Sequence, residues 1–384
     1  MKKILVVAPF CSLPSEPYFN RFLFISNMLS NHYDVTLVTS NFRHFDKTHR
    51  DSKLYSDKIK IVLLDEPGYE NNVSISRVYS HHVFCRNFEA WFEDAAEQFD
   101  LVYSAYPLIK TNDIINKYKK IFSYIHILDV QDVWPESISS ALPFVDKINE
   151  EWLPFSGRAN KVYSEVDAIV AVSKTYLSRA SRYATTDYLS HVYIGSSIND
   201  SVYLAKRKKM LPAEKIKLFY MGTLSHSYDI ETIIRSCKVL NNTGYDVEFH
   251  VFGDGPHRAV LEGISDSSVI FYGFIKYEDM LRKIESLDIA VNPIHSYAKQ
   301  SVTNKISDYL SIRKPILSSQ RCSEVKDLLS RTVYRDYESS STDSFISSFK
   351  EIILDQGDCP SFPDFNREVS YREISNLIEE LLDD

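Results

Sequence analysis

The residues that could do chemistry lie where predicted strands end in the second half of the chain. Four loops follow such strands, namely Gly222-Thr223-Leu224, Gly253-Asp254-Gly255-Pro256, Gly273-Phe274-Ile275 and Pro293-Ile294-His295. Glycine lets the backbone approach a ligand closely, and the start of a following helix offers unpaired N–H groups to an anion such as a diphosphate. The pattern indicates a nucleotide-type ligand, with the alternative that the glycines only permit tight turns.

Other common phosphate and metal motifs are absent. No G-x-x-x-x-G-K-[ST] loop occurs and no G-x-G-x-x-G follows the first predicted strand, which argues against P-loop hydrolases and ordinary dehydrogenases. No H-E-x-x-H or D-x-D pattern is present, so the sequence does not suggest a divalent metal at the active site.

These loops need sheets to position them, and the sequence predicts two. Short apolar runs alternate with longer segments of helical period, which is typical of parallel sheets with crossover helices. In the first half we expect a long helix over about 75–98 and strands over 4–8, 35–39, 59–64, 101–104, 122–128 and 168–172. In the second half we expect strands over 216–221, 247–252, 269–272, 288–292 and 315–318, each followed by a helix.

The predicted fold class is therefore α/β, with two Rossmann-like, doubly wound parallel-sheet domains. The periodic pattern lapses between 184 and 213, where a basic cluster at 206–209 is followed by Pro212. We expect an N-terminal domain over 1–185, a hinge over 186–212 and a second domain over 213–361. Residues 362–384 should form a C-terminal helix that packs back on the domains.

Composition excludes several classes of protein. The chain has 384 residues, 44% of them hydrophobic, and a net charge of −8, so it is neither disordered nor a basic nucleic-acid-binding protein. A local basic excess over 43–60 is interpreted as a solvated loop in preference to a phosphate or membrane-surface contact. The five scattered cysteines are typical of reduced core residues in a cytoplasmic protein, and no apolar stretch is long enough to span a bilayer.

The order of the segments resembles the retaining glycosyltransferases of family 4, in particular the bacterial branch that builds capsule, O-antigen and other polysaccharide units. In the first half the resemblance rests on Asp129-Val130-Gln131-Asp132-Val133-Trp134-Pro135-Glu136-Ser137 and on Asp167 to Ser173. In the second half it rests on Gly222-Thr223-Leu224, on Phe252 to Pro256, and on Asn304 to Leu310 leading to Lys314-Pro315-Ile316.

This resemblance implies a GT-B fold, in which two Rossmann-like domains face a central cleft. It implies an acceptor-binding N-terminal domain, a donor-binding C-terminal domain, and metal-independent, retaining transfer of a sugar from a UDP- or GDP-linked donor, with no cofactor. The implied acceptor is a glycan or a lipid diphosphate-linked sugar. The implied location is cytoplasmic, with room for peripheral contact at the inner face of the membrane.

Carried over position by position, the resemblance names donor-site residues. Asp308 matches the second acid of the family's paired-glutamate motif, which binds ribose, and the position of the first acid is Gln300, an amide. The family's basic pair falls on Thr223 and Tyr228, neither of which is charged. We therefore expect Lys305 to face the diphosphate, with Arg258, Lys299 and Arg313 as other candidates. The alternative for Lys305 is that it snorkels on a surface helix.

The remaining donor contacts come from backbone and small side chains. Thr223 is expected to contact the donor, with backbone contact at Gly222, Gly253 and Gly255. Contact with the nucleobase is expected at Phe274 and Ile275, although a buried aromatic plug is equally consistent for Phe274. Side-chain partners for sugar hydroxyls and phosphate are expected at Ser301, Thr303 and Asn304.

In the acceptor half, Asp132 should lie beyond a strand end and orient the acceptor hydroxyl or accept its proton. A turn-capping role is the alternative, because Asp-x-x-Pro segments commonly form turns. Predicted acceptor-binding residues are Phe10, Ser12, Arg21 and Trp134, with a surface salt bridge as the alternative for Arg21. His126 is expected to be a core histidine.

Three functions stay open at this point. The first is a glycosyltransferase, with Asp132, Gln300 and Lys305 as its catalytic residues. The second is a GT-B sugar-nucleotide epimerase, which would need acid and base carboxylates around the sugar, and Gln300 counts against it. The third is a non-catalytic GT-B partner subunit, which the residues at 223, 228 and 300 allow.

Overall fold

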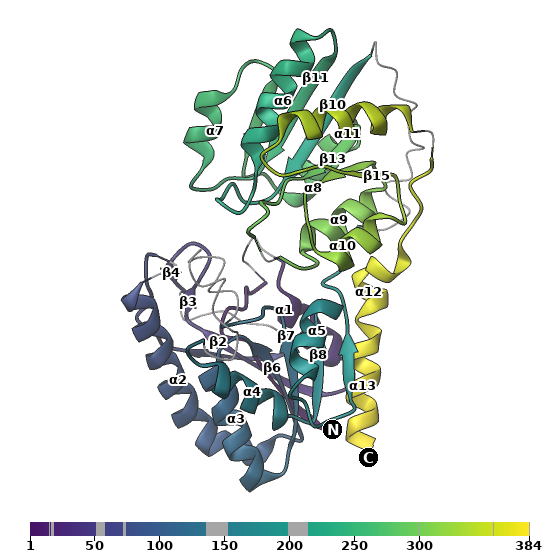
Figure 1. Cartoon of the computed structure of the whole chain (residues 1–384). Coiled ribbons are helices and arrows are strands. Elements are labelled where there is room, and N and C mark those ends of the chain that lie inside the picture. The colour runs from purple at the N-terminus through teal and green to yellow at the C-terminus, as the bar shows by residue number, and fades with distance from the viewer. Residues whose placement is uncertain are drawn as a thin grey trace. The chain divides into compact units, whose positions relative to one another are not determined.

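The computed structural model describes residues 1–14, 16, 19–50, 58–71, 74–135, 153–198, 214–298, 300–355 and 357–383, which form two compact units (Figure 1). Unit 1 comprises Met1–Val192 and Tyr371–Asp384, and unit 2 comprises Tyr193–Ser370. The chain passes from unit 1 to unit 2 after Val192, within the predicted hinge, and returns after Ser370. Residues 199–212 of that hinge lie outside the described residues.

Unit 1 contains a parallel sheet of seven strands. Its order is β5 (Lys60–Leu64), β2 (Asp34–Ser40), β1 (Lys3–Val7), β6 (Leu101–Tyr106), β7 (Ile125–Val130), β8 (Ala168–Ala171) and β9 (Leu189–His191). The six predicted strands are confirmed, and β9 is an addition at the edge. A short antiparallel hairpin, β3 (Phe42–Arg43) and β4 (Thr48–His49), follows β2.

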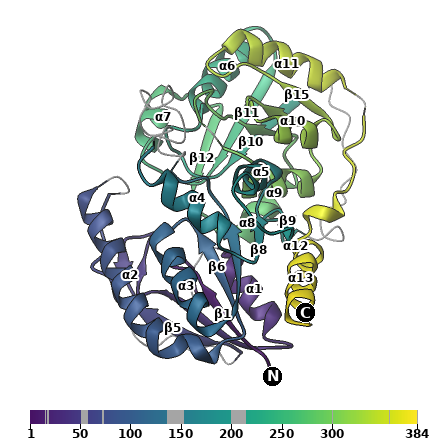
Figure 2. The same cartoon turned by 60° about the horizontal axis from the view of Figure 1, so that its bottom comes forward.

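Helices pack on both faces of this sheet. Successive residues of a strand point to opposite faces, so each strand contributes side chains to both layers. Ile4 and Val6 pack with α1 (Arg21–Leu29) and α13 (Arg372–Asp383), which lie side by side in Figures 1 and 2. Leu5 and Val7 pack with α2 (Ile75–Ala95) and α3 (Ile109–Phe122) on the other face. A smaller apolar cluster joins α4 (Ser156–Ser164) and α5 (Lys174–Ser181) to β7 and β8.

Unit 2 contains a parallel sheet of six strands. Its order is β12 (Val269–Gly273), β11 (Asp246–Phe252), β10 (Lys215–Met221), β13 (Ile289–Asn292), β14 (Ile316–Ser318) and β15 (Tyr334–Asp336). In chain order this is 3-2-1-4-5-6, the order of dinucleotide-binding Rossmann domains, with the topological switch point between β10 and β13. The five predicted strands are confirmed, and β15 was not predicted.

The side chains of β10 in unit 2 point alternately into two apolar layers. Leu218 and Tyr220 pack with α6 (Ile230–Asn242) and α11 (Thr342–Leu354). Phe219 and Met221 face the layer formed by α8 (Tyr277–Ile284), α9 (Asn304–Ile312) and α10 (Ser323–Leu329). The short helices α7 (Arg258–Ile264) and α12 (Arg367–Ser370) complete the unit.

Two further expectations from the sequence concern the cysteines and membrane-spanning helices. All five cysteines are free thiols, and four of them are buried. Among the described residues, no helix is long and apolar enough to cross a membrane.

Candidate functional site

The loops after β10, β11, β12 and β13 meet at the carboxyl edge of the sheet in unit 2. The Gly222 N–H donates to the Phe252 carbonyl at 2.9 Å, and the Gly253 N–H donates to the Gly273 carbonyl at 2.9 Å. Across the switch point, an isolated bridge pairs Tyr228 with Ile294. Parallel α/β sheets bind ligands at this edge, next to the switch point.

Glycines make this close packing of loops possible. A Cβ atom on Gly253, whose φ is +124°, would lie 2.0 Å from the Gly222 carbonyl oxygen. A Cβ atom on Gly255 would lie 2.3 Å from the Leu224 carbonyl oxygen. A Cβ atom on Gly222, whose φ is +139°, would lie 2.9 Å from the Lys305 Nζ atom. The glycines therefore allow the loops to pack on one another and let a lysine ammonium approach bare backbone.

Lys305 lies in the first turn of α9 and is buried, with 9% of its surface exposed. Its Nζ atom donates to the Tyr220 hydroxyl at 3.1 Å and lies 3.4 Å from the ring centroid of Tyr228. Burial lowers the pKa of Lys305 well below its usual value, and no charged group among the described residues counters this. The surface-lysine alternative is therefore wrong.

The start of α9 adds further unpaired polar groups beside Lys305. Thr303 is the N-cap residue, yet its side chain makes no capping hydrogen bond, and its Oγ1 atom is buried with no partner among the described residues. The first turn of α9 contains no acidic side chain. Because a helix N-terminus carries partial positive charge, this corner of unit 2 favours an anion.

Asp308 lies one turn further along α9. Its Oδ1 atom accepts hydrogen bonds from the Ser196 hydroxyl at 2.6 Å and from the Tyr277 hydroxyl at 2.7 Å. Burial raises the pKa of Asp308, and these two hydrogen bonds oppose that rise. Both bonds use Oδ1, so the carboxylate keeps Oδ2 as an acceptor for a ligand hydroxyl.

Gln300 is positioned through both its backbone and its side chain. The Gln320 Nε2 atom donates to the carbonyls of Gln300, at 2.8 Å, and Ser301, at 3.0 Å. The Tyr228 hydroxyl donates to Gln300 Oε1 at 3.4 Å, while its ring covers Lys305. Tyr228 thus contacts both the predicted catalytic amide of Gln300 and the buried ammonium of Lys305. A basic side chain at position 228 would bring a second positive charge close to Lys305.

The other predicted donor residues occupy the same loops with different exposure. Phe274 is 55% exposed, so the buried-plug alternative is wrong, and Ile275 packs against the apolar layer beside α8. Ser301 is buried and Asn304 is exposed at the start of α9. Thr223 is exposed on the loop after β10, and its carbonyl accepts a hydrogen bond from the Tyr220 hydroxyl at 2.8 Å.

In unit 1, the loop after β1 carries Phe10 and Ser12, and Arg50 holds it in place. The Arg50 guanidinium donates to Glu16 Oε1 at 2.6 Å and to the Cys11 carbonyl at 2.7 Å. The side chains of Arg50 and Glu16 are only 3% and 6% exposed. The interpretation of 43–60 as a solvated loop is therefore wrong for Arg50, whose burial with Glu16 shapes this loop.

Arg21 is buried inside unit 1. Its Nε atom donates to Asp129 Oδ2 at 2.8 Å, and its NH1 group donates to the Val192 carbonyl at 3.0 Å. The Tyr103 hydroxyl donates to the same Asp129 oxygen at 2.5 Å, and the Tyr371 ring lies 4.7 Å from the guanidinium carbon. These contacts join α1, β7 and Tyr371, which directly precedes α13. The alternative of a surface salt bridge for Arg21 is therefore wrong, and its observed contacts are internal.

Asp132 and Trp134 follow β7. Asp132 Oδ1 accepts from the Val133 N–H at 2.8 Å, a turn-type contact, and the Trp134 ring lies 5.5 Å from that of Phe155. Glu136 and Ser137 of the same motif lie outside the described residues. The core role of His126 is confirmed, since it is fully buried and hydrogen bonded to Ser104.

Comparison with known proteins places this geometry. A family model described as Glycosyl transferases group 1 matches residues 215–346, which lie within unit 2. Sucrose-phosphate synthase from Thermosynechococcus elongatus has a similar structure, with a TM-score of 0.71, 12% sequence identity and 99% of each chain covered. The chain has the GT-B fold.

Other GT-B structures agree over the full length. The lipopolysaccharide outer core galactosyltransferase WaaB superimposes with a TM-score of 0.61 and 14% identity, covering 99% of both chains. Anabaena HepE in complex with UDP and glucose superimposes with a TM-score of 0.60 and 13% identity, covering 100% of this chain and 99% of HepE. No curated protein matches this chain by sequence.

The loops after β10 and β11 also carry two histidines that the sequence did not single out. The Nε2 atoms of His226 and His257 lie 2.9 Å apart and bring the loops after β10 and β11 together. The pKa of His257 is lowered, first by burial and then by His226 and His295. No motif links positions 31 residues apart, so only the fold reveals this pair. Among the described residues, no group of three or more potential ligands is arranged to hold a metal.

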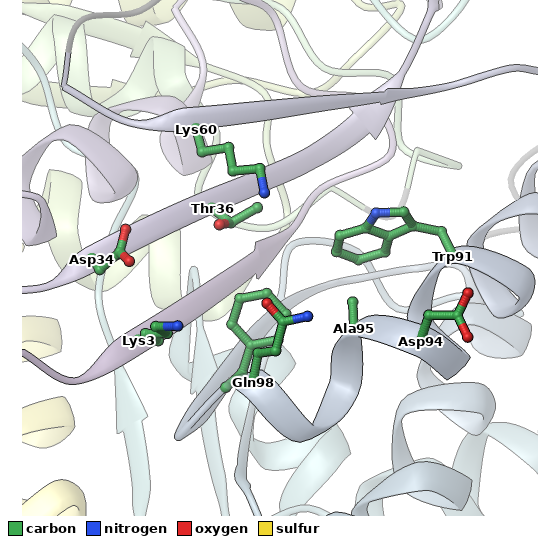
Figure 3. Close-up of a pocket in the computed structure, with 9 residues that line it drawn as sticks. Lys3, Asp34, Thr36, Lys60, Trp91, Asp94, Ala95 and Gln98 are labelled. Atoms are coloured by element: carbon green, nitrogen blue, oxygen red, sulfur yellow. The ribbon is translucent and has the colours of Figure 1, made fainter.

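A cavity lies at the opposite edge of the GT-B sheet in unit 1. It has a volume of about 320 Å³ and is lined by residues that begin β1, β2 and β5, with Trp91 and Asp94 of α2 (Figure 3). Its lysines and aspartates carry both signs of charge. It belongs to the amino-terminal ends of the strands and contains none of the predicted site residues.

Proposed function

We propose that the protein is a glycosyltransferase that uses a nucleotide-activated sugar as donor. The observation that carries this proposal is the buried ammonium of Lys305 at the N-terminus of α9, with no carboxylate among the described residues to neutralise it. A donor diphosphate would supply the missing negative charge. The match of unit 2 to Glycosyl transferases group 1, and the UDP in the similar HepE structure, support the same ligand class.

The donor can be assigned to the loops of unit 2. Its diphosphate would lie against Gly222, Thr223, Thr303 and Lys305, where glycine backbone and a helix start meet. Its ribose would bind Oδ2 of Asp308, and its base would lie beside Phe274 and Ile275. Gln300, Ser301 and Asn304 would then contact sugar hydroxyls, and a UDP- or GDP-linked donor satisfies this arrangement.

We further propose that transfer retains the anomeric configuration and needs no metal. The bond between the sugar C1 and the donor phosphate oxygen breaks, the acceptor hydroxyl oxygen bonds to C1 on the same face, and the hydroxyl proton leaves to the phosphate or to Asp132. Lys305 and the positive end of α9 would stabilise the charge that develops on the diphosphate. Asp132, held by its turn, would orient the acceptor hydroxyl.

The proposed acceptor is a glycan or a lipid diphosphate-linked sugar, in the synthesis of a bacterial surface polysaccharide. The family 4 resemblance of the Asp129 to Pro135 and Asn304 to Leu310 segments supports this assignment. It would place the protein in the cytoplasm, with peripheral contact at the inner face of the membrane where such acceptors lie.

The test is incubation of the protein with a panel of UDP- and GDP-sugars, followed by chromatography of the products. Slow hydrolysis of one donor to nucleoside diphosphate and free sugar supports a transferase, because water replaces the missing acceptor. Formation of an epimer would instead identify an epimerase, and binding without a product would identify a non-catalytic subunit. Lys326→Met is the matched control for the loss of a lysine in Lys305→Met, since Lys326 lies in unit 2 in an exposed pair with Asp336.

A further inference from the structure

A second cluster of cations lies in unit 1, around the ring of Tyr69. The Lys47 Nζ atom is 4.7 Å from the ring centroid, and the guanidinium carbon of Arg77 is 5.6 Å from it. Tyr69 follows β5, Lys47 lies in the turn between β3 and β4, and Arg77 lies in the first turn of α2. Three separate segments therefore bring two positive charges to one aromatic side chain.

Two histidines complete this Tyr69 cluster. The rings of His44 and His81 lie 5.7 Å and 5.6 Å from the Tyr69 ring. Phe10, from the loop after β1, packs against both histidines at 5.2 Å and 5.3 Å. The cluster thus lies beyond the carboxyl ends of β1, β2 and β5, the edge at which parallel sheets bind ligands.

Polar atoms of the cluster are ready to donate to a ligand. The Tyr69 hydroxyl is hydrogen bonded to His44 Nδ1, and when the hydroxyl donates, the proton of the neutral His44 ring lies on Nε2. His81 Nε2 is buried with no hydrogen-bond partner among the described residues. An unsatisfied buried polar atom lowers stability, so a ligand that formed a hydrogen bond with it would gain affinity.

The field within the cluster is positive. The pKa of His44 is lowered to about 4, first by burial and then by Lys47 and Arg77. The pKa of His81 is lowered to about 3 by burial and then by Arg77, His44 and Lys47. Burial and Arg77 also lower the pKa of Lys47. The Glu66 carboxylate raises the pKa of Tyr69 and accepts a hydrogen bond from the Ser80 hydroxyl at 2.6 Å.

We propose that Lys47, Arg77, His44 and His81 form, around Tyr69, a binding site for a phosphate or diphosphate ester. The two cations supply charge-assisted hydrogen bonds, the neutral imidazoles supply further N–H donors, and Phe10 and Tyr69 give the site an apolar wall. The site is separate from the donor loops of unit 2. The assignment of the ester to the acceptor rests on the proposed function, whereas the site itself does not.

The direct test is NMR of the full chain with ¹⁵N-labelled histidine, saturated with nucleoside diphosphate, during titration with inorganic pyrophosphate. We expect the imidazole signals of His44 and His81 to move and their pKa values to rise by at least one unit, because a bound anion favours the charged ring. Changes confined to His226, His257 and His295 of unit 2 would overturn the proposal. This titration of the wild-type chain needs no variant to fold.

Variants then locate the charge. Lys47→Gln and Arg77→Gln should each weaken pyrophosphate binding at least tenfold. Arg43→Gln is the matched control, because Arg43 lies in the same segment in a pair with Asp46, and it should change the affinity less than twofold. Equal affinity in all three variants would overturn the assignment.

Two further ligands identify the source of the ester. Farnesyl diphosphate binding at least tenfold more tightly than pyrophosphate indicates a lipid-linked diphosphate, whereas tighter binding of glucose 1-phosphate indicates a soluble sugar phosphate. Either result supports the site, and failure of all three ligands to move His44 and His81 contradicts it. The donor-hydrolysis assay keeps the two proposals distinguishable, since hydrolysis without these shifts contradicts only the site, and shifts without hydrolysis contradict only the proposed function.

Discussion

Two buried arginines of unit 1 differ from a buried lysine of unit 2 in what neutralises their charge. In unit 1, Arg21 and Arg50 are buried against the carboxylates of Asp129 and Glu16 at 2.8 Å and 2.6 Å. In unit 2, Lys305 is buried against the rings of Tyr220 and Tyr228, with no described carboxylate to pair it. Loss of one partner of a buried ion pair destabilises a fold strongly, because it leaves the other charge uncompensated. A buried charge that lacks a partner already carries this cost and indicates a ligand of opposite charge.

The largest loss of stability is expected when one of the paired arginines is replaced. Arg21→Met leaves the buried Asp129 carboxylate without its cation, so the free energy of unfolding should fall by about 3–5 kcal/mol. Urea denaturation measures this loss. Lys119→Met is the control, because Lys119 forms a partly exposed pair with Asp167 and its loss should change stability by less than about 1 kcal/mol. An equal, small effect of both variants would mean that the Arg21 pair is not structural.

The second prediction concerns the unpaired side. Lys305→Met should reduce donor hydrolysis about 100-fold, the usual consequence of losing a group that stabilises transition-state charge. In the absence of ligand the same variant should melt at a higher temperature than the wild type, because a buried, uncompensated ammonium is removed. Thermal melting and steady-state rates measure the two effects, with Lys326→Met as control. A lower melting temperature with unchanged hydrolysis would make Lys305 a structural residue like Arg21.

A third prediction tests how Lys305 is accommodated. Gly222→Ala adds a Cβ atom 2.9 Å from Lys305 Nζ at a φ of +139°, so stability should fall by about 1–3 kcal/mol. Donor affinity should fall as well, because the ammonium must move. Gly263→Ala in α7 is the matched control, since a methyl group there would meet no neighbouring segment within 4 Å. Unchanged donor affinity in Gly222→Ala would separate the glycine from the ammonium.

The smallest expected effect concerns ribose. Asp308→Asn keeps an acceptor oxygen for Ser196 and Tyr277 but removes the negative charge, so the Kd for nucleoside diphosphate should rise about tenfold, or about 1.4 kcal/mol. Calorimetric titration with the nucleoside diphosphate and the matching 2′-deoxynucleoside diphosphate checks the assignment. If Asp308 binds the 2′-hydroxyl of ribose, Asp308→Asn should discriminate between the two ligands less than the wild type does.

Much of the fold could be predicted from the sequence because strand periodicity and glycine position are local properties. Most strands of both sheets follow from short apolar runs. The strands β9 (Leu-Ser-His) and β15 (Tyr-Arg-Asp) are short and mostly polar, so they carry no such run. The resemblance correctly indicated that the GT-B fold would organise these strands. The end of unit 1 at Val192 depends on pairing of β9 with β8, which sequence pattern does not reveal.

The candidate site was predictable where chemistry is carried by one segment, and not where it depends on contacts between segments. Lys305 and Asp308 lie three residues apart on one helix and could be named together. The cover of Lys305 by Tyr228, the Arg50 to Glu16 pair and the His226 to His257 contact join residues 77, 34 and 31 positions apart. Charge at Arg50 and Arg21 indicated surface or ligand contact, because the sequence does not show that each finds a buried carboxylate.

The uptake of protons on ligand binding is the most direct test of whether Lys305 binds a diphosphate. In the free protein burial holds the pKa of Lys305 below its usual value of about 10.4, and a bound diphosphate would raise it. Between these two pKa values, binding must therefore take up a proton. Titration calorimetry with UDP or GDP at pH 9, where the phosphates are already ionised, in two buffers of different ionisation enthalpy, measures that uptake. We predict that the wild type takes up more protons on binding than Lys305→Met does, and equal uptake in both would contradict the binding of a diphosphate by Lys305.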